Sequence, residues 1–419
     1  MRARFFHVTM IASAVSAAVA CATTEEVPSS PDQPNPLDDG GSGTAEASVD
    51  AAVLPEAAAP DAPSDPTCSP AGWCITELPD PELEVKDIWP LEKRAFALAS
   101  DQYAGFKILE WSGDVSQEGG WKYIDDNTQQ DLYPGEPGNI WAPNDDEVYY
   151  TLRGETRGGY LYHGRRPSPP ATEWTWTRTP FQCAHPLDTP AVWGSGGDVY
   201  ALDCSKIYRL TGDPDADADV AADGGSSPWT LEYTDDDPTP IVFFGGGGTA
   251  DDSLFVGARG YLYPCTIIVR KTAAGYQRVV DGSPVSTLST TCKEKPGYPM
   301  VPGLYGFSAT RPREVLGTLL FEDKLLKVAI DGDGTASVTE ANPQPPISQA
   351  VWSGSPDEVW LGGGYLLHGT GIWGDGGSYQ VSTVALNEGR PVASFTKIRG
   401  ISNSNLWAVG TRAYHKTTP

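Results

Sequence analysis

The chain has 419 residues with 29 Lys and Arg against 55 Asp and Glu, so its formal charge is −26. Its 46 glycines and 37 prolines argue against a helical protein, because Gly and Pro are the poorest helix formers, whereas 13 Trp, 18 Tyr and 11 Phe favour pleated sheet. Such negative charge repels phosphate backbones, so we expect no nucleic-acid partner.

Residues 1–20 predict a secretory signal peptide. Arg2 and Arg4 form a basic start, residues 5–19 are apolar, and small residues lead to Cys21. The apolar stretch is shorter than the roughly 18 to 20 residues that span a bilayer. We therefore expect an exported protein.

The residues before Cys21 allow two kinds of cleavage. Ala18-Val19-Ala20 resembles a bacterial lipobox, after which Cys21 would carry a lipid, but ordinary signal peptidase also accepts Ala-x-Ala. Lipidation would use one of seven cysteines and leave an even number, which suits disulfide pairing in an exported protein. We favour a lipoprotein of the outer membrane or cell surface, whose only membrane contact is this anchor. A secreted or periplasmic protein is the alternative.

Residues 21–66 predict a disordered tether. Residues 22–66 contain ten acids, eight prolines and nine alanines, and no Lys, Arg or aromatic residue. Such a segment buries too little apolar surface to offset its ordering entropy, and its like charges extend it. The folded domain is expected from residue 67 to residue 419.

That domain repeats a pattern at intervals of about fifty residues. AVWGSGGDVYALDCSKIYRLTG at 191–212 corresponds to AVWSGSPDEVWLGGGYLLHGTG at 350–371, and both predict three strands with turns between them. The first-strand aromatic recurs in six units, with an arginine in the seventh: Trp89, Trp141, Trp193, Phe243, Phe307, Trp352 and Arg399. The second-strand pairs are Ala95-Phe96, Val148-Tyr149, Val199-Tyr200, Leu254-Phe255, Val315-Leu316, Val359-Trp360 and Leu406-Trp407.

Seven units of four short strands without intervening helices predict an all-β, seven-bladed β-propeller. The last unit ends at AYHKTTP (413–419), where its fourth strand is missing. GWCITELPDP (72–81) is similar to the fourth strand in PWTLEYTDDDP (228–238). We therefore expect an N-terminal strand to complete the C-terminal blade.

The phrases GSPDEVWLGGGYLLHGTG (354–371) and SNSNLWAVG (402–410) resemble repeats of propeller lipoproteins that Gram-negative bacteria export. More distantly they are similar to photosystem II assembly-factor and sialidase-like propellers. The resemblance covers residues 68–419 and implies a fold but no activity. The sialidase Asp-box and arginine triad have no counterpart in this sequence.

Six cysteines remain for disulfides, and their fifteen possible pairings stay open. Proximity along the chain favours sequential pairs, which join Cys68 to Cys74, Cys183 to Cys204 and Cys265 to Cys292. The absence of a Cys-x-x-Cys spacing argues against zinc.

Four histidines follow the signal, and we interpret none as catalytic. His163, His368 and His415 occupy the same place in three repeats, which indicates a structural role within the blade. His185 lies beside Cys183 in a predicted loop. No Gly-x-Ser-x-Gly nucleophile elbow accompanies them.

Two further segments resemble ligand-binding loops. Asp213, Asp215, Asp217, Asp219 and Asp223 are spaced like a calcium loop but lack its central Gly and final Glu, so we expect a flexible acidic loop. Residues 245–248, four glycines, are not followed by the Lys and helix of a phosphate loop, so we expect a turn. Residues 331–334 predict a hairpin turn. We expect no metal and no cofactor.

The pattern therefore favours a monomeric, non-enzymatic module that binds or scaffolds a protein or glycan through a loop face. The alternative is an extracellular carbohydrate-active enzyme on the same scaffold. Two facing carboxylates in the channel would favour the enzyme, and a channel lined by apolar or Trp side chains would favour binding. The first-strand Trp residues are expected to form inter-blade core and, less favoured, a sugar-stacking surface.

Overall fold

The computed structural model describes residues 68–101, 105–113, 120–127, 137–154, 159–181, 189–214, 227–319, 322–345, 349–374, 376–384 and 394–418. The expected signal, the tether, Cys21, Cys183, His185 and the four aspartates at 215–223 lie outside these residues. Within the described ranges, no helix is long and apolar enough to cross a bilayer.

Seven antiparallel four-stranded sheets form the blades of a propeller in the described part of the chain. Blade one contains β2 (Glu84–Pro90), β3 (Ala95–Asp101), β4 (Gly105–Trp111) and β5 (Trp121–Tyr123). Blade two contains β6 (Pro137–Asn144), β7 (Glu147–Arg153), β8 (Gly159–Arg165) and β9 (Thr175–Phe181). Blade three contains β10 (Ala191–Ser195), β11 (Asp198–Asp203), β12 (Lys206–Leu210) and β13 (Trp229–Thr234).

The remaining blades follow the same order. Blade four contains β14 (Ile241–Thr249), β15 (Asp252–Arg259), β16 (Cys265–Thr272) and β17 (Gly275–Val280). Blade five contains β20 (Leu304–Ser308), β21 (Glu314–Leu319), β22 (Leu325–Ile330) and β23 (Ala336–Ala341). Blade six contains β24 (Ala350–Ser355), β25 (Glu358–Gly362), β26 (Leu366–Thr370) and β27 (Ser378–Ser382). Blade seven combines β28 (Phe395–Ser402), β29 (Asn405–Gly410) and β30 (Ala413–Lys416) with the N-terminal β1 (Trp73–Thr76).

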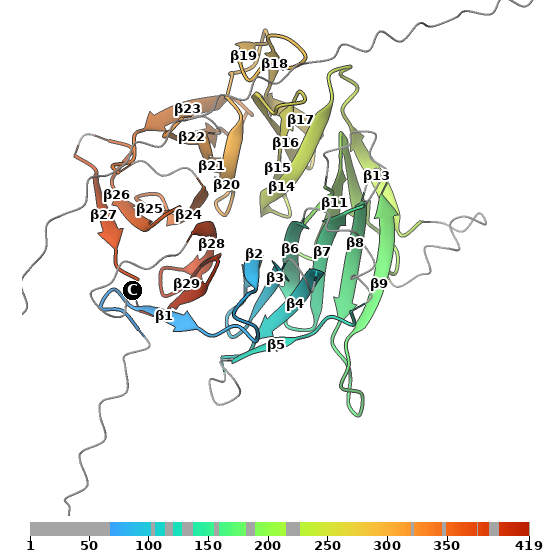
Figure 1. Cartoon of the computed structure of the whole chain (residues 1–419). Coiled ribbons are helices and arrows are strands. Elements are labelled where there is room, and N and C mark those ends of the chain that lie inside the picture. The colour runs from blue at the N-terminus through green and yellow to red at the C-terminus, as the bar shows by residue number, and fades with distance from the viewer. Residues whose placement is uncertain are drawn as a thin grey trace, which may run out of the picture. The chain divides into compact units, whose positions relative to one another are not determined.

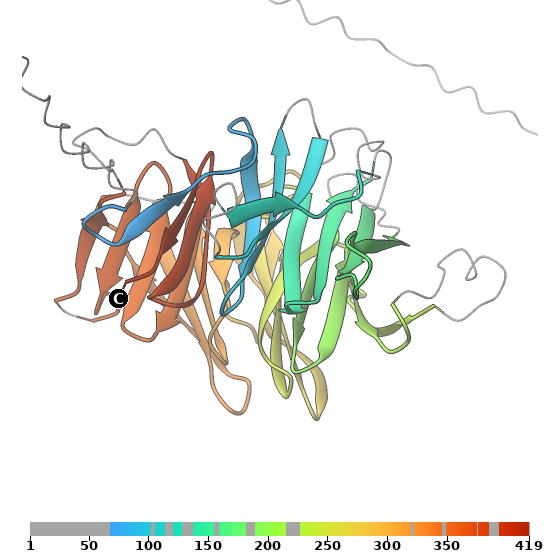
Figure 2. The same cartoon turned by 90° about the horizontal axis from the view of Figure 1, so that it is seen from below.

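The first strand of each blade surrounds the centre of the ring and the fourth lies at its outside (Figure 1). Seen from the side, the strands run between the two faces of the disc (Figure 2). Alternating side chains of neighbouring sheets are buried between the blades, which is how such small sheets gain a core. The predicted seven-bladed propeller is confirmed.

The N-terminal strand closes the ring as predicted. β1 pairs antiparallel with β30, so that Trp73 lies opposite Lys416 and Thr76 opposite Ala413. Trp73 is fully buried and packs edge-on against Trp360, with 5.5 Å between the ring centroids. The first and last segments of the folded chain therefore share one sheet.

The repeat positions lie where the pattern predicts, with a difference in two blades. In five blades the first-strand residue lies directly opposite the second-strand aromatic: Trp89 with Phe96, Trp141 with Tyr149, Trp193 with Tyr200, Trp352 with Trp360, and Arg399 with Trp407. In blades four and five, Phe243 and Phe307 face Gly257 and Gly317 instead. The residues that lie opposite Phe255 and Leu316 are Gly246 and Ser308, so the predicted first-strand positions are offset by three residues in blade four and by one residue in blade five.

A small hairpin between blades four and five was not expected from the repeat. It consists of β18 (Gly282–Pro284) and β19 (Cys292–Glu294), which pair antiparallel. The expected turn at 331–334 is present, because Ile330 at the end of β22 lies opposite Ala336 at the start of β23.

Candidate binding site in the central channel

The first strands of all seven blades enclose a central cavity of about 770 Å³. Each blade contributes at least two described residues to its wall, from β2, β6, β10, β14, β20, β24 and β28. The volume lies within the range of small-molecule sites, about 300 to 1,000 Å³. The centre of the ring is thus the main candidate for ligand binding.

Aromatic side chains form much of this wall. They are Trp89, Trp193, Phe244, Tyr263, Tyr305, Phe307 and Trp352. Trp193 and Trp352 are 6% and 2% exposed, so most of each ring lies between blades. Trp89, Phe244 and Phe307 are only half-buried and leave more ring surface toward the cavity. We expected the first-strand Trp residues to be buried between blades. Trp193 and Trp352 agree with this expectation better than Trp89 does.

The four glycines at 245–248 belong to β14 and line the cavity, so the predicted turn is wrong. Neighbouring blades approach Gly245, Gly246 and Gly247 too closely for a side chain, and Gly248 has a positive φ of 96°. A Cβ atom on Gly246 would lie 2.9 Å from the ring of Trp193, and one on Gly247 would collide with the carbonyl oxygen of Ala309. The pattern suggested a turn because these contacts come from residues far away in the sequence.

The charged side chains of the cavity wall are all cationic among the described residues: Arg311, Lys397 and Arg399. Two of them have carboxylate partners outside the wall. Arg311 donates to Glu314 at 2.7 Å, and Arg399 donates to both oxygens of Asp87 at 3.0 and 3.2 Å. The described residues of this wall include no Asp or Glu, so they do not form the two facing carboxylates that would favour a carbohydrate-active enzyme.

Asp87 joins three blades at the closing seam. Its buried carboxylate accepts hydrogen bonds from Arg399 of blade seven and, at 3.1 Å, from the backbone N–H of Ile140 in blade two. Arg399 also lies over the ring of Trp89, 5.0 Å from its centroid. In blade two, Asn139 has the matching role, since its side chain accepts from the N–H of Val192 at 2.8 Å.

Lys397 occupies the corresponding position in blade seven, two residues before Arg399, as Asp87 and Asn139 precede Trp89 and Trp141. Its side chain is half-buried in the cavity wall. Burial lowers the pKa of its ammonium group, attraction to Asp87 opposes that shift, and the charge of Arg399 adds to it. No described residue hydrogen-bonds or ion-pairs with the ammonium group. Lys397 was not among the site residues predicted from the sequence, although a basic residue at the position where two other blades have Asp or Asn was a usable signal.

Apolar side chains extend from the cavity onto the surface beside blades four and five. Tyr263 and Tyr305 line the cavity, and Tyr305 is 59% exposed. Tyr261 and Leu262, in the connection between β15 and β16, are each 39% exposed. A ligand leaving the cavity on this side would meet an apolar surface.

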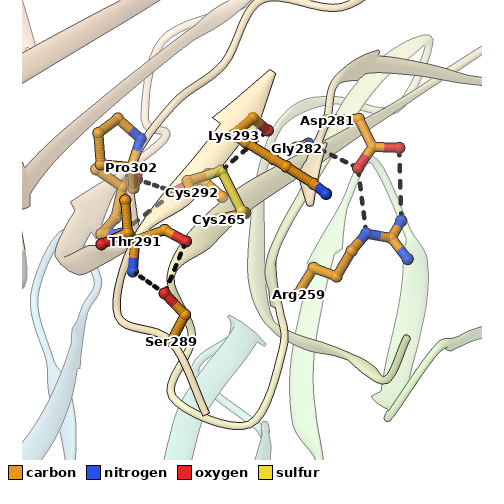
Figure 3. Close-up of a disulfide and its surroundings, with 11 residues drawn as sticks. Arg259, Cys265, Asp281, Gly282, Ser289, Thr291, Cys292, Lys293 and Pro302 are labelled. Carbon is orange, nitrogen blue, oxygen red and sulfur yellow. Dashed lines mark hydrogen bonds and ion pairs between the residues drawn. A yellow bond between two sulfur atoms is a disulfide. The ribbon is translucent and has the colours of Figure 1, made fainter. Parts of the chain in front are cut away.

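The small hairpin beside this surface is fixed covalently and by ion pairs. The Cys265–Cys292 disulfide joins β19 to the start of β16 (Figure 3). Next to it, buried Arg259 contacts Asp281 at 3.2 Å (Figure 3). Lys295 contacts the same carboxylate at 2.9 Å. Gly282 lies so close to Cys292 that a Cβ atom would collide with its sulfur.

The Cys68–Cys74 disulfide is likewise present and joins the segment before β1 to the second residue of that strand. Two of the three predicted pairings are thus confirmed. Cys204 is also disulfide-bonded, while Cys183 lies outside the described residues, so their pairing stays a prediction. In the described residues, no group of three or more His, Cys, Asp or Glu side chains could hold a metal ion.

The three repeated histidines stack on the second-strand aromatic of their own blade. His163 stacks on Tyr149, His368 on Trp360 and His415 on Trp407, at centroid distances of 4.5, 4.3 and 4.2 Å. Burial lowers the pKa of His368 and lowers that of His415 to about 4. His415 is therefore a neutral packing group at neutral pH.

Comparison with known proteins shows similarity of fold alone. No protein-family model matches the chain, and no curated protein matches it. YCF48 from Cyanidioschyzon merolae superposes with a TM-score of 0.50 at 11% identity, covering 82% of this chain and 98% of that one. YCF48 bound to D1 peptide gives 0.49 at 14% identity, covering 85% and 100%.

The WD40 propeller domain of Doa1 gives a TM-score of 0.46 at 8% identity, covering 82% of this chain and 97% of that one. At 11% identity, the similarity to YCF48 from Cyanidioschyzon merolae shows the propeller fold alone.

Proposed function

We propose that this protein is an exported binding or scaffolding module, anchored at the outer membrane or cell surface through a lipid on Cys21. The basic start and apolar stretch before Cys21 support export, and the acidic, proline-rich segment 22–66 suits a spacer between anchor and propeller. The propeller holds a protein or a glycan without altering it. Kinship with the propeller lipoproteins of Gram-negative bacteria belongs to the same proposal.

One observation carries the binding role: the central cavity has an aromatic wall, and its described charged residues are all cations. Glycoside hydrolysis ordinarily requires a pair of carboxylates about 5 to 9.5 Å apart that face the substrate. Half-buried aromatic rings such as Trp89 and Phe307 instead supply contact area at small entropic cost. This wall suits recognition better than acid–base chemistry.

The test immobilises the full chain purified from its native envelope, whose intact mass is expected to include a lipid on Cys21. Solubilised envelope proteins and glycans are passed over it and over a Tyr305→Ser variant. Because exposed aromatics at a binding face dominate affinity, we expect the variant to bind the retained component at least about tenfold more weakly.

The matched control is Tyr123→Ser, which removes a 44%-exposed tyrosine from the outer strand of blade one. It should bind like wild type. Cleavage of a retained glycan by the wild-type protein would overturn the non-enzymatic role, and equal binding by all three proteins would overturn the assignment of this face.

A further inference from the structure

The charge of the central cavity is opposite to that of the protein. Acidic residues outnumber basic ones by 55 to 29 in the whole chain, yet the described wall has three basic side chains and no acidic one. A cation in a recess of low dielectric constant attracts an anion more strongly than one on the surface does. The cavity is therefore complementary to an anionic ligand.

Lys397 is the group left to meet that anion. The guanidinium groups of Arg311 and Arg399 already hydrogen-bond to Glu314 and Asp87. The Arg399–Asp87 ion pair joins blades seven and one at this seam, and the ammonium group of Lys397 is not a member of that pair. A half-buried ammonium group that has no hydrogen-bonding partner among the described residues gains most when an oxygen of a ligand replaces the water it lost on burial.

When protonated, the ammonium group of Lys397 adds one positive charge that no described residue meets with a hydrogen bond or ion pair, and this charge matches a ligand with a single negative charge. A dianion such as a phosphate monoester would leave one charge unpaired in the cavity, at a desolvation cost that one lysine does not offset. The rest of the wall is mostly aromatic or apolar, with Trp89, Phe244 and Phe307 half-buried around the centre. These surfaces suit an apolar body attached to the anionic group.

We propose that the central cavity binds a monocarboxylate on an aromatic or branched apolar body, with the carboxylate accepting hydrogen bonds from Lys397. The inference rests on the proposed binding function and names the chemistry of what the cavity holds. A free aromatic acid and the C-terminal residue of a peptide present this same chemistry.

The experiment titrates the full chain with 3-phenylpropionate and with the neutral 3-phenylpropan-1-ol, followed by calorimetry and by tryptophan fluorescence. Hydrogen bonds to charged groups contribute about 1.5 to 3 kcal/mol, so the acid should bind about tenfold to a hundredfold more tightly than the alcohol. Lys397→Met keeps the length of the side chain without its charge and should abolish this difference. Lys397→Arg should retain most of it.

Lys324→Met is the matched control, because Lys324 is a half-buried lysine that pairs with Glu322 and Glu340 outside the cavity. It should bind both probes like wild type. The peptide Ala-Ala-Phe, with a free or an amidated C-terminus, distinguishes the two sources. If the peptide with a free C-terminus binds more tightly than the amidated peptide while 3-phenylpropionate binds weakly, the ligand is the C-terminal residue of a peptide. If 3-phenylpropionate binds tightly and neither peptide does, the ligand is a free aromatic acid.

Equal binding of acid and alcohol, unaffected by Lys397→Met, would overturn the carboxylate inference while leaving a binding cavity in place. Failure of all the probes to bind would overturn the inference too. Neither outcome decides the proposed function, which depends on the separate comparison of Tyr305→Ser with Tyr123→Ser. Intact folding of Lys397→Met is checked by its thermal unfolding midpoint, which should match wild type.

Discussion

The imidazole of His415 shows how a polar residue serves the core of a blade. Its ring stacks on Trp407 at 4.2 Å, with 10° between the planes, and its Nε2 lies 3.1 Å from the amide oxygen of Asn405. The Asn405 amide in turn donates to the carbonyl oxygen of Leu91 in blade one at 3.1 Å. Because the site is buried, protonation would place a charge where water cannot reach it.

Acid should therefore destabilise the fold through His415. Burial lowers its folded-state pKa from 6.5 to about 4, so below pH 6.5 the unfolded state takes up a proton that the folded state does not. The stabilising contribution is fully present above pH 6.5 and is lost as the pH falls toward 4, by up to about 3 kcal/mol. Denaturant titrations at pH 7 and pH 4.5 should show a smaller loss for His415→Phe, which keeps the stacking. An equal loss in both proteins would contradict this origin.

At the scale of strands, the sequence predicts what depends on local pattern. The blades and the β1–β30 pairing could be predicted because aromatic and β-branched residues recur at fixed intervals and one strand was missing at the end. The strand at 245–248 was wrongly predicted as a turn, because its glycines are required by close contacts with Trp193 and Ala309, which belong to other blades. The importance of Lys397 likewise depends on Arg399 pairing with Asp87 across the seam, which periodicity does not reveal.

The hairpin of β18 and β19 should depend on its disulfide for rigidity. Its two strands have three residues each, too few for a stable two-stranded sheet by itself. In a Cys265→Ala/Cys292→Ala variant, amide hydrogens of residues 282–294 should exchange at least about tenfold faster, since local opening loses a covalent restraint.

The exchange of β14 and β15 should change little in that variant, because the ion pairs of Arg259 with Asp281 and Asp235 remain. Cys68→Ala/Cys74→Ala serves as the control and should leave residues 282–294 unchanged. Unaltered exchange in the first variant would mean that Lys295 and its carboxylate partners hold the hairpin without the disulfide.

For the whole molecule, closure makes one end of the folded chain depend on the other. β1 contributes the outer strand of blade seven, and Trp73 fills the space between this strand and Trp360 of blade six. Its indole N–H also donates to Ser382 in β27 at 2.9 Å. Nearer the centre of the ring, the ion pair of Asp87 in β2 with Arg399 in β28 also joins the N-terminal and C-terminal parts of the folded chain. A ring whose blades are stabilised by their neighbours should lose stability as a unit when either junction fails.

Replacing Trp73 by Ala should therefore weaken the entire propeller. Removal of a fully buried Trp costs about 3 to 5 kcal/mol, and detachment of β1 would also expose the edge of β30. We expect the denaturation midpoints from far-ultraviolet circular dichroism and from tryptophan fluorescence to fall together. Leu231→Ala, at a 48%-exposed position in the outer strand of blade three, should change stability by less than about 0.5 kcal/mol. If Trp73→Ala altered the fluorescence alone and left the dichroism midpoint in place, the N-terminal strand would be an appendage of blade seven, and closure of the ring would rest on the Asp87–Arg399 junction.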